Sequence, residues 1–305
     1  MARDWEGQLR TWATAPGTVE QQKIDRAEKE IRAAISASRK LAGHSIDVFP
    51  QGSYRNRTNV PRESDVDICV RCSDTFYYDF YPENDLAKKA ASISPASYGY
   101  ADFKTDVGAA LIARFGGSAT RGDKAFNVRE TTLRVEADVI ATFEYRRYTG
   151  VGWDGRATYV KPIGTSFYPD SGSAKIINWP QQHYDNGVAK NTSTRERFKA
   201  MVRVLKNLRN EMDDQKVAAA APIASYLVEC LVWNVPNAQF GHSTYLDELR
   251  EALRFLYHGT KTADACKDWG EVNELKYLLR GGQPWTREQV NAFILAAWSY
   301  VGFKE

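Results

Sequence analysis

The sequence predicts an α+β fold, in which a mixed sheet with flanking helices is followed by an α-helical lobe. Two observations support this class. Strand-like and helix-like patterns alternate up to about residue 180, and from Ser193 onward apolar residues recur almost throughout at helical spacing. We therefore expect a first lobe of residues 1–185 and a second of residues 186–305, with the active site in the cleft between them.

The composition is that of a soluble globular protein, with 43% apolar and 26% charged residues among 305. The formal net charge of +3 is too small to require a polyanionic partner, so a nucleotide site must come from local clustering. No run approaches about 18 uncharged apolar residues, and the N-terminus lacks the apolar stretch of a secretion signal. We expect a cytoplasmic protein that does not associate with membranes.

The first lobe begins with a long amphipathic helix, predicted over residues 18–42. Its apolar residues share one face, and Thr18 with Gln21 forms a capping box. The sequence then predicts two strands, two helices, two more strands and a hairpin. The first two strands are expected at residues 46–50 and 65–72, and the two helices at 82–93 and 100–116. The next two strands are expected within 127–148, and the hairpin is formed by residues 158–169 and 174–179.

The second lobe follows a turn-rich connector, expected at residues 180–193. Ser193 and Glu196 form a capping box for the helix after it, and Thr286 and Gln289 form another near the end. The helices of this lobe are expected at residues 194–212, 222–235, 245–259, 269–282 and 286–302.

The cysteines and histidines do not have the spacing of a metal site. Cys69 and Cys72 have the C-x2-C spacing of a zinc knuckle, but no second pair follows them. A strand would also place them on opposite faces. The four histidines form no pair at helical spacing, so we expect neither a zinc site nor a disulfide.

Two aspartates, Asp65 and Asp67, flank one valine at the head of the strand at 65–72. Residues i and i+2 of a strand share a face, so the two carboxylates would lie side by side. The apolar residues after them indicate partial burial, so either their pKa values rise or a cation offsets their charge. Oxygen ligands favour Mg²⁺ or Mn²⁺, although a D-x-D pair alone is more often a solvated strand entrance.

Two further features favour the metal interpretation. Gly52 and Ser53 precede the aspartates across one loop, where a glycine lets a backbone N–H approach a phosphate and a serine adds a donor. Asp138 lies on a strand whose alternate residues are apolar, so its carboxylate would project from the opposite face. A third carboxylate could complete a two-metal site. Glu136 shares that face and is the weaker candidate.

Together these motifs resemble the G-S…D-x-D…D signature of the DNA polymerase β-like nucleotidyltransferases. Within them the sequence is most similar to the cGAS/DncV-like enzymes (CD-NTases) and their oligoadenylate synthetase relatives. In order and spacing the resemblance extends from about Thr18 to Trp233. One departure is Ala141, where relatives often have proline. The resemblance rests on the stretches GSYRNRT, SDVDICV, RVEADVI, NWPQQHYDNGVAKNTSTRERFKAMVRVLKNLRN and APIASYLVECLVW.

The second lobe carries a basic stripe, because Lys199, Arg203 and Lys206 recur at intervals of four and three on one predicted helix. The stripe could be a solvated face, or it could be aimed at a triphosphate. The resemblance implies the second: Lys206 matches the lysine that holds the donor triphosphate. Ser225 matches a phosphate-contacting serine, and Tyr226 a tyrosine that stacks on a base, although Tyr226 could also be ordinary core.

Asn178 lies on the predicted hairpin, where relatives place residues that read the base. Its amide offers both a donor and an acceptor, so it could discriminate bases, or it could cap a turn. With Gln51, Gly52, Ser53 and Lys199 it completes the nucleotide-binding residues that we expect.

The resemblance implies a polymerase β-like catalytic lobe that uses two Mg²⁺ or Mn²⁺ ions held by Asp65, Asp67 and Asp138. Asp138 would also assist deprotonation of the attacking ribose hydroxyl. Ribonucleoside triphosphates would be joined into a cyclic di- or trinucleotide second messenger with release of pyrophosphate. The setting implied is bacterial anti-phage (CBASS-type) signalling through a separate effector protein. We expect a monomer with no obligatory nucleic acid.

Three alternatives remain at this point. A template-independent RNA or tRNA nucleotidyltransferase of the same fold is disfavoured by the near-neutral charge and the lack of a basic tail. A catalytically silent nucleotide- or RNA-binding sensor would not need three converging carboxylates. A toxin or antitoxin nucleotidyltransferase that modifies a protein or tRNA fits the two-lobed layout less well.

Overall fold

The computed structural model describes residues 3–15, 17–61, 65–131, 135–172 and 174–304. Its contacts divide the chain into two compact units, which we call the sheet unit and the helical unit. The sheet unit comprises Gly17–Tyr54 and Ser64–Gln182. The helical unit comprises Met1–Pro16, Arg55–Glu63 and His183–Glu305.

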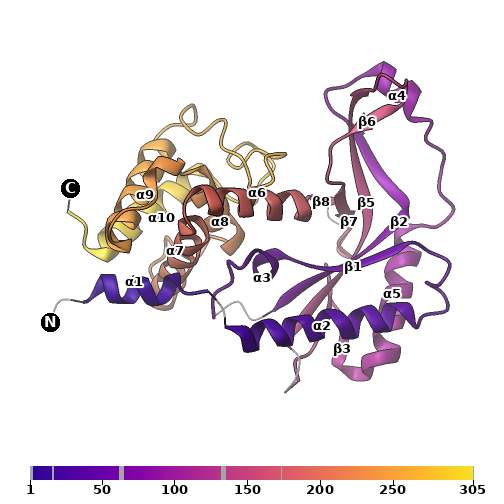
Figure 1. The fold of residues 1–305 in the computed structure, drawn as a ribbon, viewed down its shortest axis with the longest axis horizontal. Helices are drawn as coiled ribbons and strands as arrows, with labels where there is room; N and C mark the ends of the chain where they lie inside the picture. The colour runs from indigo at the N-terminus through magenta and orange to yellow at the C-terminus, as the bar shows by residue number, and fades with distance from the viewer. Residues whose placement is uncertain (1–2, 16, 62–64, 132–134, 173, 305) are drawn as a thin grey trace. The chain divides into compact units, whose positions relative to one another are not determined.

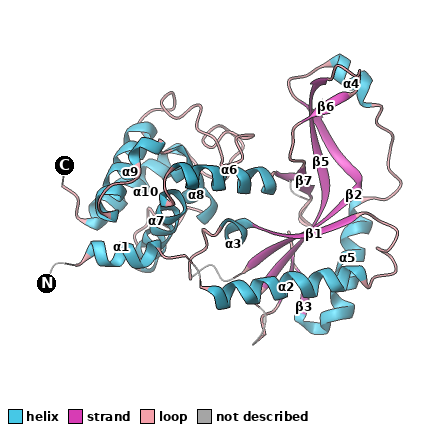
Figure 2. Ribbon diagram, viewed as in Figure 1, coloured by secondary structure: helices cyan, strands magenta, loops and turns pink. Residues whose placement is uncertain are grey.

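The α+β prediction is confirmed, because one unit is built on a mixed sheet and the other on helices (Figures 1 and 2). The contacts group two short segments, residues 3–15 and 55–61, with the helical unit. The sequence-based boundary after residue 185 placed both in the first lobe. As a division between functional domains, that boundary stays a prediction.

In the described residues, eight strands form one sheet with the order β1-β2-β5-β4-β3, while β6 and β7 pair with β5 and β8 pairs with β7. β2 and β5 run parallel, and the other pairs are antiparallel. The strands are β1 (Ile46–Gln51), β2 (Val66–Phe80), β3 (Ala119–Arg121), β4 (Phe126–Val128), β5 (Ala137–Val151), β6 (Ala157–Tyr159), β7 (Gly164–Phe167) and β8 (Ile176–Asn178).

Helices α2 (Thr18–Ser36) and α5 (Tyr100–Phe115) pack with the sheet around one apolar core. The predicted alternation in β5 is confirmed, because Ala137, Val139 and Ala141 belong to this core and Asp138 does not. A further short α-helix of this unit is α4 (Asp85–Ala91). The short helix α3 (Gly52–Asn56) crosses the division, since Gly52–Tyr54 is grouped with the sheet unit and residues 55–56 with the helical unit. A 3-10 turn, η1 (Gly116–Ser118), follows α5.

The long N-terminal helix is confirmed, but it is shorter than predicted and begins differently. α2 ends at Ser36, and after Ala37 the backbone N–H groups of Ser38, Leu41 and His44 bond three residues back, as from Leu41 to Ser38. That tighter turn lets Leu41 reach the core at 2% exposure. The N-cap is Gly17, so the predicted capping box at Thr18 is wrong.

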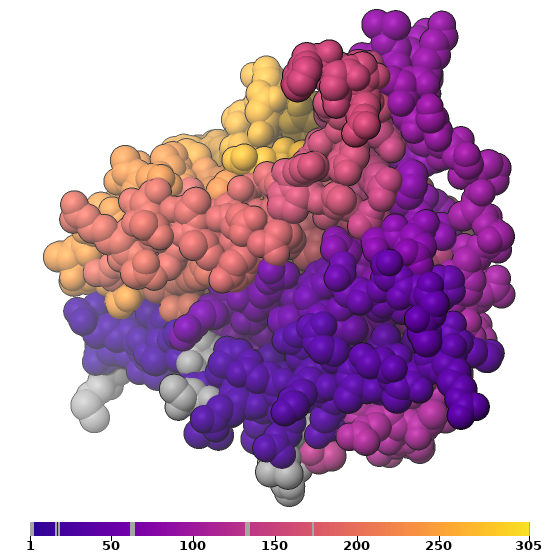
Figure 3. Space-filling model, turned by 45° about the vertical axis from the view of Figure 1, so that its right-hand side comes forward, coloured from indigo at the N-terminus to yellow at the C-terminus, as the bar shows by residue number. Residues whose placement is uncertain are grey.

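The outer halves of β2 and β5 continue the sheet as an arm that carries α4 and β6 at its tip (Figure 1). In the space-filling view the tip near α4, in purple, projects from the sheet unit (Figure 3). A β-bulge between Cys72 and Phe76 separates the two halves of β2. The inner half of β2, which carries Asp67, therefore pairs with β5 in a different register from the outer half.

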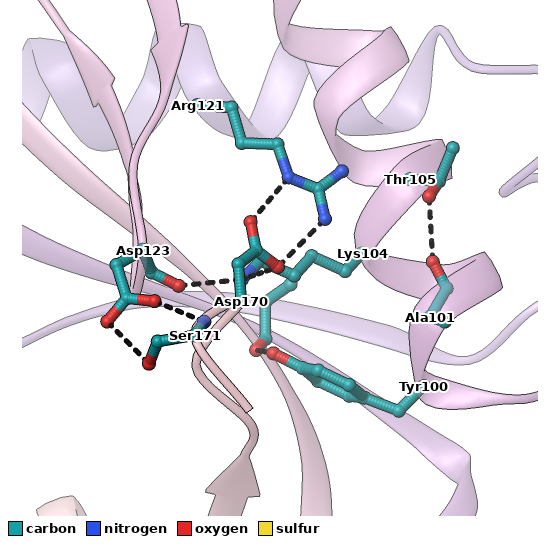
Figure 4. Close-up of polar contacts among 9 residues, drawn as sticks. Tyr100, Ala101, Lys104, Thr105, Arg121, Asp123, Asp170 and Ser171 are labelled. Atoms are coloured by element: carbon teal, nitrogen blue, oxygen red, sulfur yellow. Dashed lines mark hydrogen bonds and ion pairs between the residues drawn. The ribbon is translucent and has the colours of Figure 1, made fainter. Parts of the chain in front are cut away.

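A polar cluster fixes the loop between β7 and β8 against the rest of the sheet unit (Figure 4). Asp170 accepts hydrogen bonds from Lys104 on α5 at 2.8 Å and from Arg121 on β3 at 2.7 and 2.9 Å. Those two cations hold the pKa of Asp170 well below its usual range, the Arg121 hydrogen bond contributing most. Asp123 accepts from the Ser171 backbone N–H at 2.6 Å. The cluster fixes the hairpin whose second strand ends at Asn178.

The described helices of the helical unit are α1 (Trp5–Ala13), α6 (Pro180–Ser193), α7 (Arg197–Asp214), α8 (Ser225–Asn234), the 3-10 turn η2 (Asn237–Gln239), α9 (Tyr245–Thr260) and α10 (Arg287–Val301). Helices α1, α7, α8, α9 and α10 contribute to a second apolar core, whereas no described residue of α6 or η2 belongs to it. Among the described helices, none combines the length and the apolar character needed to cross a lipid bilayer.

Residues 180–193, predicted as a connector, form the helix α6, so that prediction is wrong. Its buried residues are His183, Gly187 and Asn191, spaced by four. They lie on one helical face, but none is a large apolar residue, so the hydrophobic pattern gave no signal. A helix with a polar buried face needs hydrogen-bond partners for those side chains, and His183 has one in Glu229.

Two other predictions for this unit are wrong. The first is the capping box of Ser193 and Glu196. Glu196 is instead the N-cap of α7 with a φ of 65°, and it is the Thr194 hydroxyl that accepts a hydrogen bond from the Phe198 N–H at 3.0 Å. Residues 269–282, all described, form turns and one bridge instead of an α-helix. The reason is Glu271, 3% exposed, whose carboxylate accepts three side-chain hydrogen bonds that a regular helix would not place there.

Candidate active site

Asp67 and Asp138 lie opposite one another on the adjacent parallel strands β2 and β5. Neighbouring strands are about 4.8 Å apart, so the two side chains leave the sheet as near neighbours on the face away from the core. Both are half-buried. The sequence predicted a third carboxylate beside the D-x-D pair, and the register brings Asp138 to that position.

Asp65 lies immediately before β2 and is exposed, so it precedes the strand that the sequence predicted it would begin. It is nevertheless close enough to affect Asp138. Burial raises the pKa of Asp138, a hydrogen bond from Asn127 opposes the rise, and the charges of Asp65 and Glu136 add to it. The carboxylates therefore repel one another in this structure.

Gly52, directly after β1, is required by the backbone and by Asp67. Its φ is +69°, a left-handed backbone conformation that residues other than glycine rarely adopt. A Cβ built there would lie 2.2 Å from Asp67 Oδ2. Gln51 pairs with Asp67 across the ladder, and Ser53 follows within α3. The Gly-Ser turn is thus packed against the carboxylate of Asp67.

Asn127, on β4, is a site residue that the sequence analysis missed. It lies opposite Asp138 in the sheet, and its amide donates to Glu136 at 2.5 Å and to Asp138 at 3.5 Å. Glu136 is therefore held by an amide and belongs to the surroundings of Asp138. No motif marks Asn127, since only the antiparallel β4–β5 register brings it there.

These residues fit a divalent metal site. Carboxylate oxygens are the ligands that Mg²⁺ and Mn²⁺ prefer. Burial, and after it the charges of Asp65 and Glu136, raise the pKa of Asp138, and a cation would offset those charges. The glycine turn leaves no side chain between the backbone and Asp67. Two divalent ions are the arrangement that three such carboxylates commonly hold.

In the helical unit, Lys199, Arg203 and Lys206 lie on α7, but they do not form a solvated face. Arg203 is 7% exposed and donates to the carbonyls of Ala13 and Arg57, while Lys206 is 1% exposed. Lys199 is half-buried with its ammonium 5.6 Å from the Tyr184 ring centre, and burial lowers its pKa. The solvated-face alternative is therefore wrong for this stripe.

Ser225 and Tyr226 begin α8. Tyr226 is 38% exposed, its hydroxyl donates to Glu271 at 2.8 Å, and its ring is 5.7 Å from that of His183. Its hydroxyl is thus fixed by a hydrogen bond, while the residue as a whole is not buried. In the sheet unit, Asn178 is half-buried at the end of β8, opposite Thr165.

A buried carboxylate in α8, Glu229, is the centre of a polar network that sequence reasoning also missed. His183, Thr58 and Lys206 all lie near it within the helical unit. The available signal was weak, since one glutamate interrupts the apolar run SYLVECLVW.

One mixed cluster lies apart from these residues in the sheet unit. The potential ligand atoms of His44, Cys72 and Asp74 lie within 4.8 Å of one another, a grouping that the sequence did not predict. Asp74 already accepts from the Ser45 N–H at 2.9 Å and lies 3.0 Å from His44 Nδ1. Cys72 is fully buried in the core, and burial raises the pKa of its thiol. These contacts account for the cluster without a metal.

Comparison with known proteins agrees with this geometry. Residues 185–302 match the family model of the cGAS/DncV-like nucleotidyltransferase C-terminal helical domain. The chain is 42% identical over 305 residues to the cyclic dipyrimidine nucleotide synthase CdnE of Cecembia lonarensis, covering 99% of this chain and 100% of the relative. It is also 42% identical over 302 residues to the protein of that name from Legionella pneumophila, covering 99% of each.

Among solved structures, the fold is similar to that of the Elizabethkingia meningoseptica CdnE cyclic dinucleotide synthase with GTP and Apcpp. The TM-score is 0.80 at 34% sequence identity, covering 99% of this chain and 100% of that one.

Proposed function

The chain belongs to the cGAS/DncV-like nucleotidyltransferase family, and from that premise we propose that it joins two ribonucleoside triphosphates into a cyclic dinucleotide and releases pyrophosphate. The observation that carries this proposal is the convergence of Asp67 and Asp138 beside the glycine turn at Gly52. A binding module gains nothing from carboxylates that repel one another, whereas a metal-dependent transferase needs them.

Pyrimidine triphosphates are the substrates that we propose. Two relatives that are 42% identical over their full length carry the name cyclic dipyrimidine nucleotide synthase. The Elizabethkingia meningoseptica structure described above, which contains GTP, is 34% identical. Asn178 is the residue that we propose to contact the base, since a side-chain amide can donate to and accept from the edge of a pyrimidine.

The chemistry divides among three carboxylates. Asp65, Asp67 and Asp138 would hold two Mg²⁺ or Mn²⁺ ions, which stabilise the charge that develops at the attacked phosphate and the leaving pyrophosphate. Asp138 would also assist deprotonation of the attacking ribose hydroxyl.

The remaining site residues would bind and orient the nucleotides. Ser53 and Ser225 supply hydroxyl donors, and Lys206 a cation, for the β- and γ-phosphates of the donor. Tyr226 would stack on a base, and Lys199 would add positive charge on the same helix as Lys206. Gln51 and Gly52 shape the turn that receives the phosphates. The protein would act in the cytoplasm as a monomer, with a separate effector responding to its product in anti-phage signalling.

Pyrophosphate release tests this proposal. The protein is incubated with UTP and CTP and with Mg²⁺ or Mn²⁺, and released pyrophosphate is measured by an enzyme-coupled assay. We expect release that requires the metal and is abolished in Asp67→Asn without loss of folding. Release only when an RNA primer is added would favour a polymerase, and nucleotide binding without release would favour a sensor.

A further inference from the structure

Glu229 on α8 is the most connected buried carboxylate near the residues that we propose to bind the triphosphate. It is 3% exposed. Its Oε1 lies 2.8 Å from His183 Nε2 and 3.4 Å from Asn56 Nδ2. Its Oε2 lies 2.8 Å from Thr58 Oγ1 and 3.9 Å from Lys206 Nζ. All five residues belong to the helical unit.

The carboxylate is ionised at neutral pH. Burial alone would raise its pKa, but the charge and hydrogen bond of His183, with Lys206 and Thr58, lower the pKa of Glu229 to about 2. An ionised carboxylate only accepts hydrogen bonds, so His183 Nε2 and Thr58 Oγ1 both carry the donated hydrogen. Removing this charge would leave the Lys206 ammonium, 1% exposed, without the carboxylate 3.9 Å from it.

The four partners of Glu229 come from separate segments. Asn56 and Thr58 lie in the segment that follows Ser53 in the chain, His183 lies on α6, and Lys206 lies on α7. Glu229 itself is one helical turn after Ser225 on α8, and residues four apart share a helix face. One carboxylate therefore fixes the mutual positions of segments that carry or adjoin three of the proposed phosphate-binding residues.

We propose that Glu229 is a positioning residue for the donor triphosphate, holding Lys206 and the segment after Ser53 in the arrangement that receives the phosphates. This inference rests on the proposed function, because it assumes that Lys206 and Ser225 contact phosphate. An ammonium has three donor hydrogens, so Lys206 can remain paired with Glu229 while it contacts a phosphate oxygen. Glu229 touches no reacting atom in this account and acts through its partners.

The test measures binding and needs no turnover. Dissociation constants for a non-hydrolysable UTP analogue and for UMP are measured by calorimetry with Mg²⁺ for the full chain and for Glu229→Gln, which keeps the shape and removes the charge. We expect the preference for the triphosphate over UMP to fall about tenfold or more, which is the factor that about 1.4 kcal/mol represents. General damage to the fold would weaken the binding of both ligands and leave the preference for the triphosphate unchanged.

Glu248→Gln is the matched control, since Glu248 is fully buried on α9 of the same unit and contacts none of these residues. It should leave the preference as in the unchanged protein. If Glu229→Gln does not fold, Thr58→Val removes one hydrogen bond at a fully buried position and should lower the preference about fivefold.

The inference is overturned if folded Glu229→Gln keeps the triphosphate preference, or if it does not fold and Thr58→Val keeps that preference. These outcomes are separate from failure of the proposed function. If Glu229→Gln lowers the triphosphate preference but the unchanged protein yields no cyclic product, the positioning role stands and the proposed activity fails. A chain that yields cyclic product with an unaltered preference in the variant would do the reverse.

Discussion

Replacing Gly52 with alanine is the most sharply defined perturbation of the proposed metal site. The added Cβ would lie 2.2 Å from Asp67 Oδ2 and 3.2 Å from its Cγ. Ordinary van der Waals contact begins at 3.4 Å, so the carboxylate oxygen must retreat by about 1.2 Å. Asp67 is on a central strand, so the side chain and not the backbone will give way.

The expected loss is larger in activity than in stability. A displacement of about 1 Å at a reacting centre costs about 100-fold in rate, and metal ligands tolerate only about 0.2 Å. We therefore expect kcat to fall at least about 100-fold. An alanine held at a φ of +69° would also strain the folded backbone, which should lower the free energy of unfolding by about 1–2 kcal/mol.

The assay is pyrophosphate release under saturating nucleotide and Mg²⁺, with urea unfolding of the same preparation. Gly43→Ala is the matched control, because nothing lies within 4 Å of a Cβ there. That variant should keep activity. A folded Gly52→Ala protein with more than about a third of the original kcat would refute the reasoning that Gly52 is required by the position of Asp67.

Three other predictions concern charge and recognition. Since the pKa of Asp138 is raised above its unfolded value, its ionised form costs stability at pH values above the folded pKa. Asp138→Asn should therefore raise the melting temperature in EDTA, reduce the stabilisation by Mg²⁺ and abolish activity; a lower melting temperature in EDTA would contradict this. Asp170→Asn deprives Lys104, 2% exposed, of its carboxylate and should lower the free energy of unfolding by about 1–3 kcal/mol in urea, whereas no change would show that the cluster of Figure 4 is dispensable. Asn178→Ala should reduce the kcat/KM ratio of UTP to ATP about fivefold, and an unchanged ratio would remove Asn178 from the base site.

The part of the active site on the sheet could be predicted because its signals are local. The alternation around Asp138 fixed which residues face the core, and the D-x-D spacing fixed the neighbouring strand. What the pattern could not give was register. Whether Asp67 or a neighbour lies opposite Asp138 depends on the pairing of strands about 70 residues apart, and that also decides the place of Asn127.

The helical unit was less predictable because its decisive contacts are polar and distant in sequence. α6 buries His183 and Asn191, so the helix carries almost no hydrophobic period. His183 is buried because Glu229, 46 residues later, receives it. The sequence alone does not show whether a single glutamate in an apolar helix is buried with partners, and only the fold shows which hydrogen-bond donors surround it.

The central claim is that the product is a cyclic dinucleotide, and mass spectrometry of the product tests it most directly. The protein is incubated with all four ribonucleoside triphosphates and Mg²⁺ or Mn²⁺, the mixture is treated with phosphatase, and surviving species are identified by mass. We predict a phosphatase-resistant cyclic dinucleotide that contains pyrimidines and disappears in the Asp65→Ala/Asp67→Ala variant. Linear products that phosphatase trims, or a cyclic species that persists in that variant, would contradict the account.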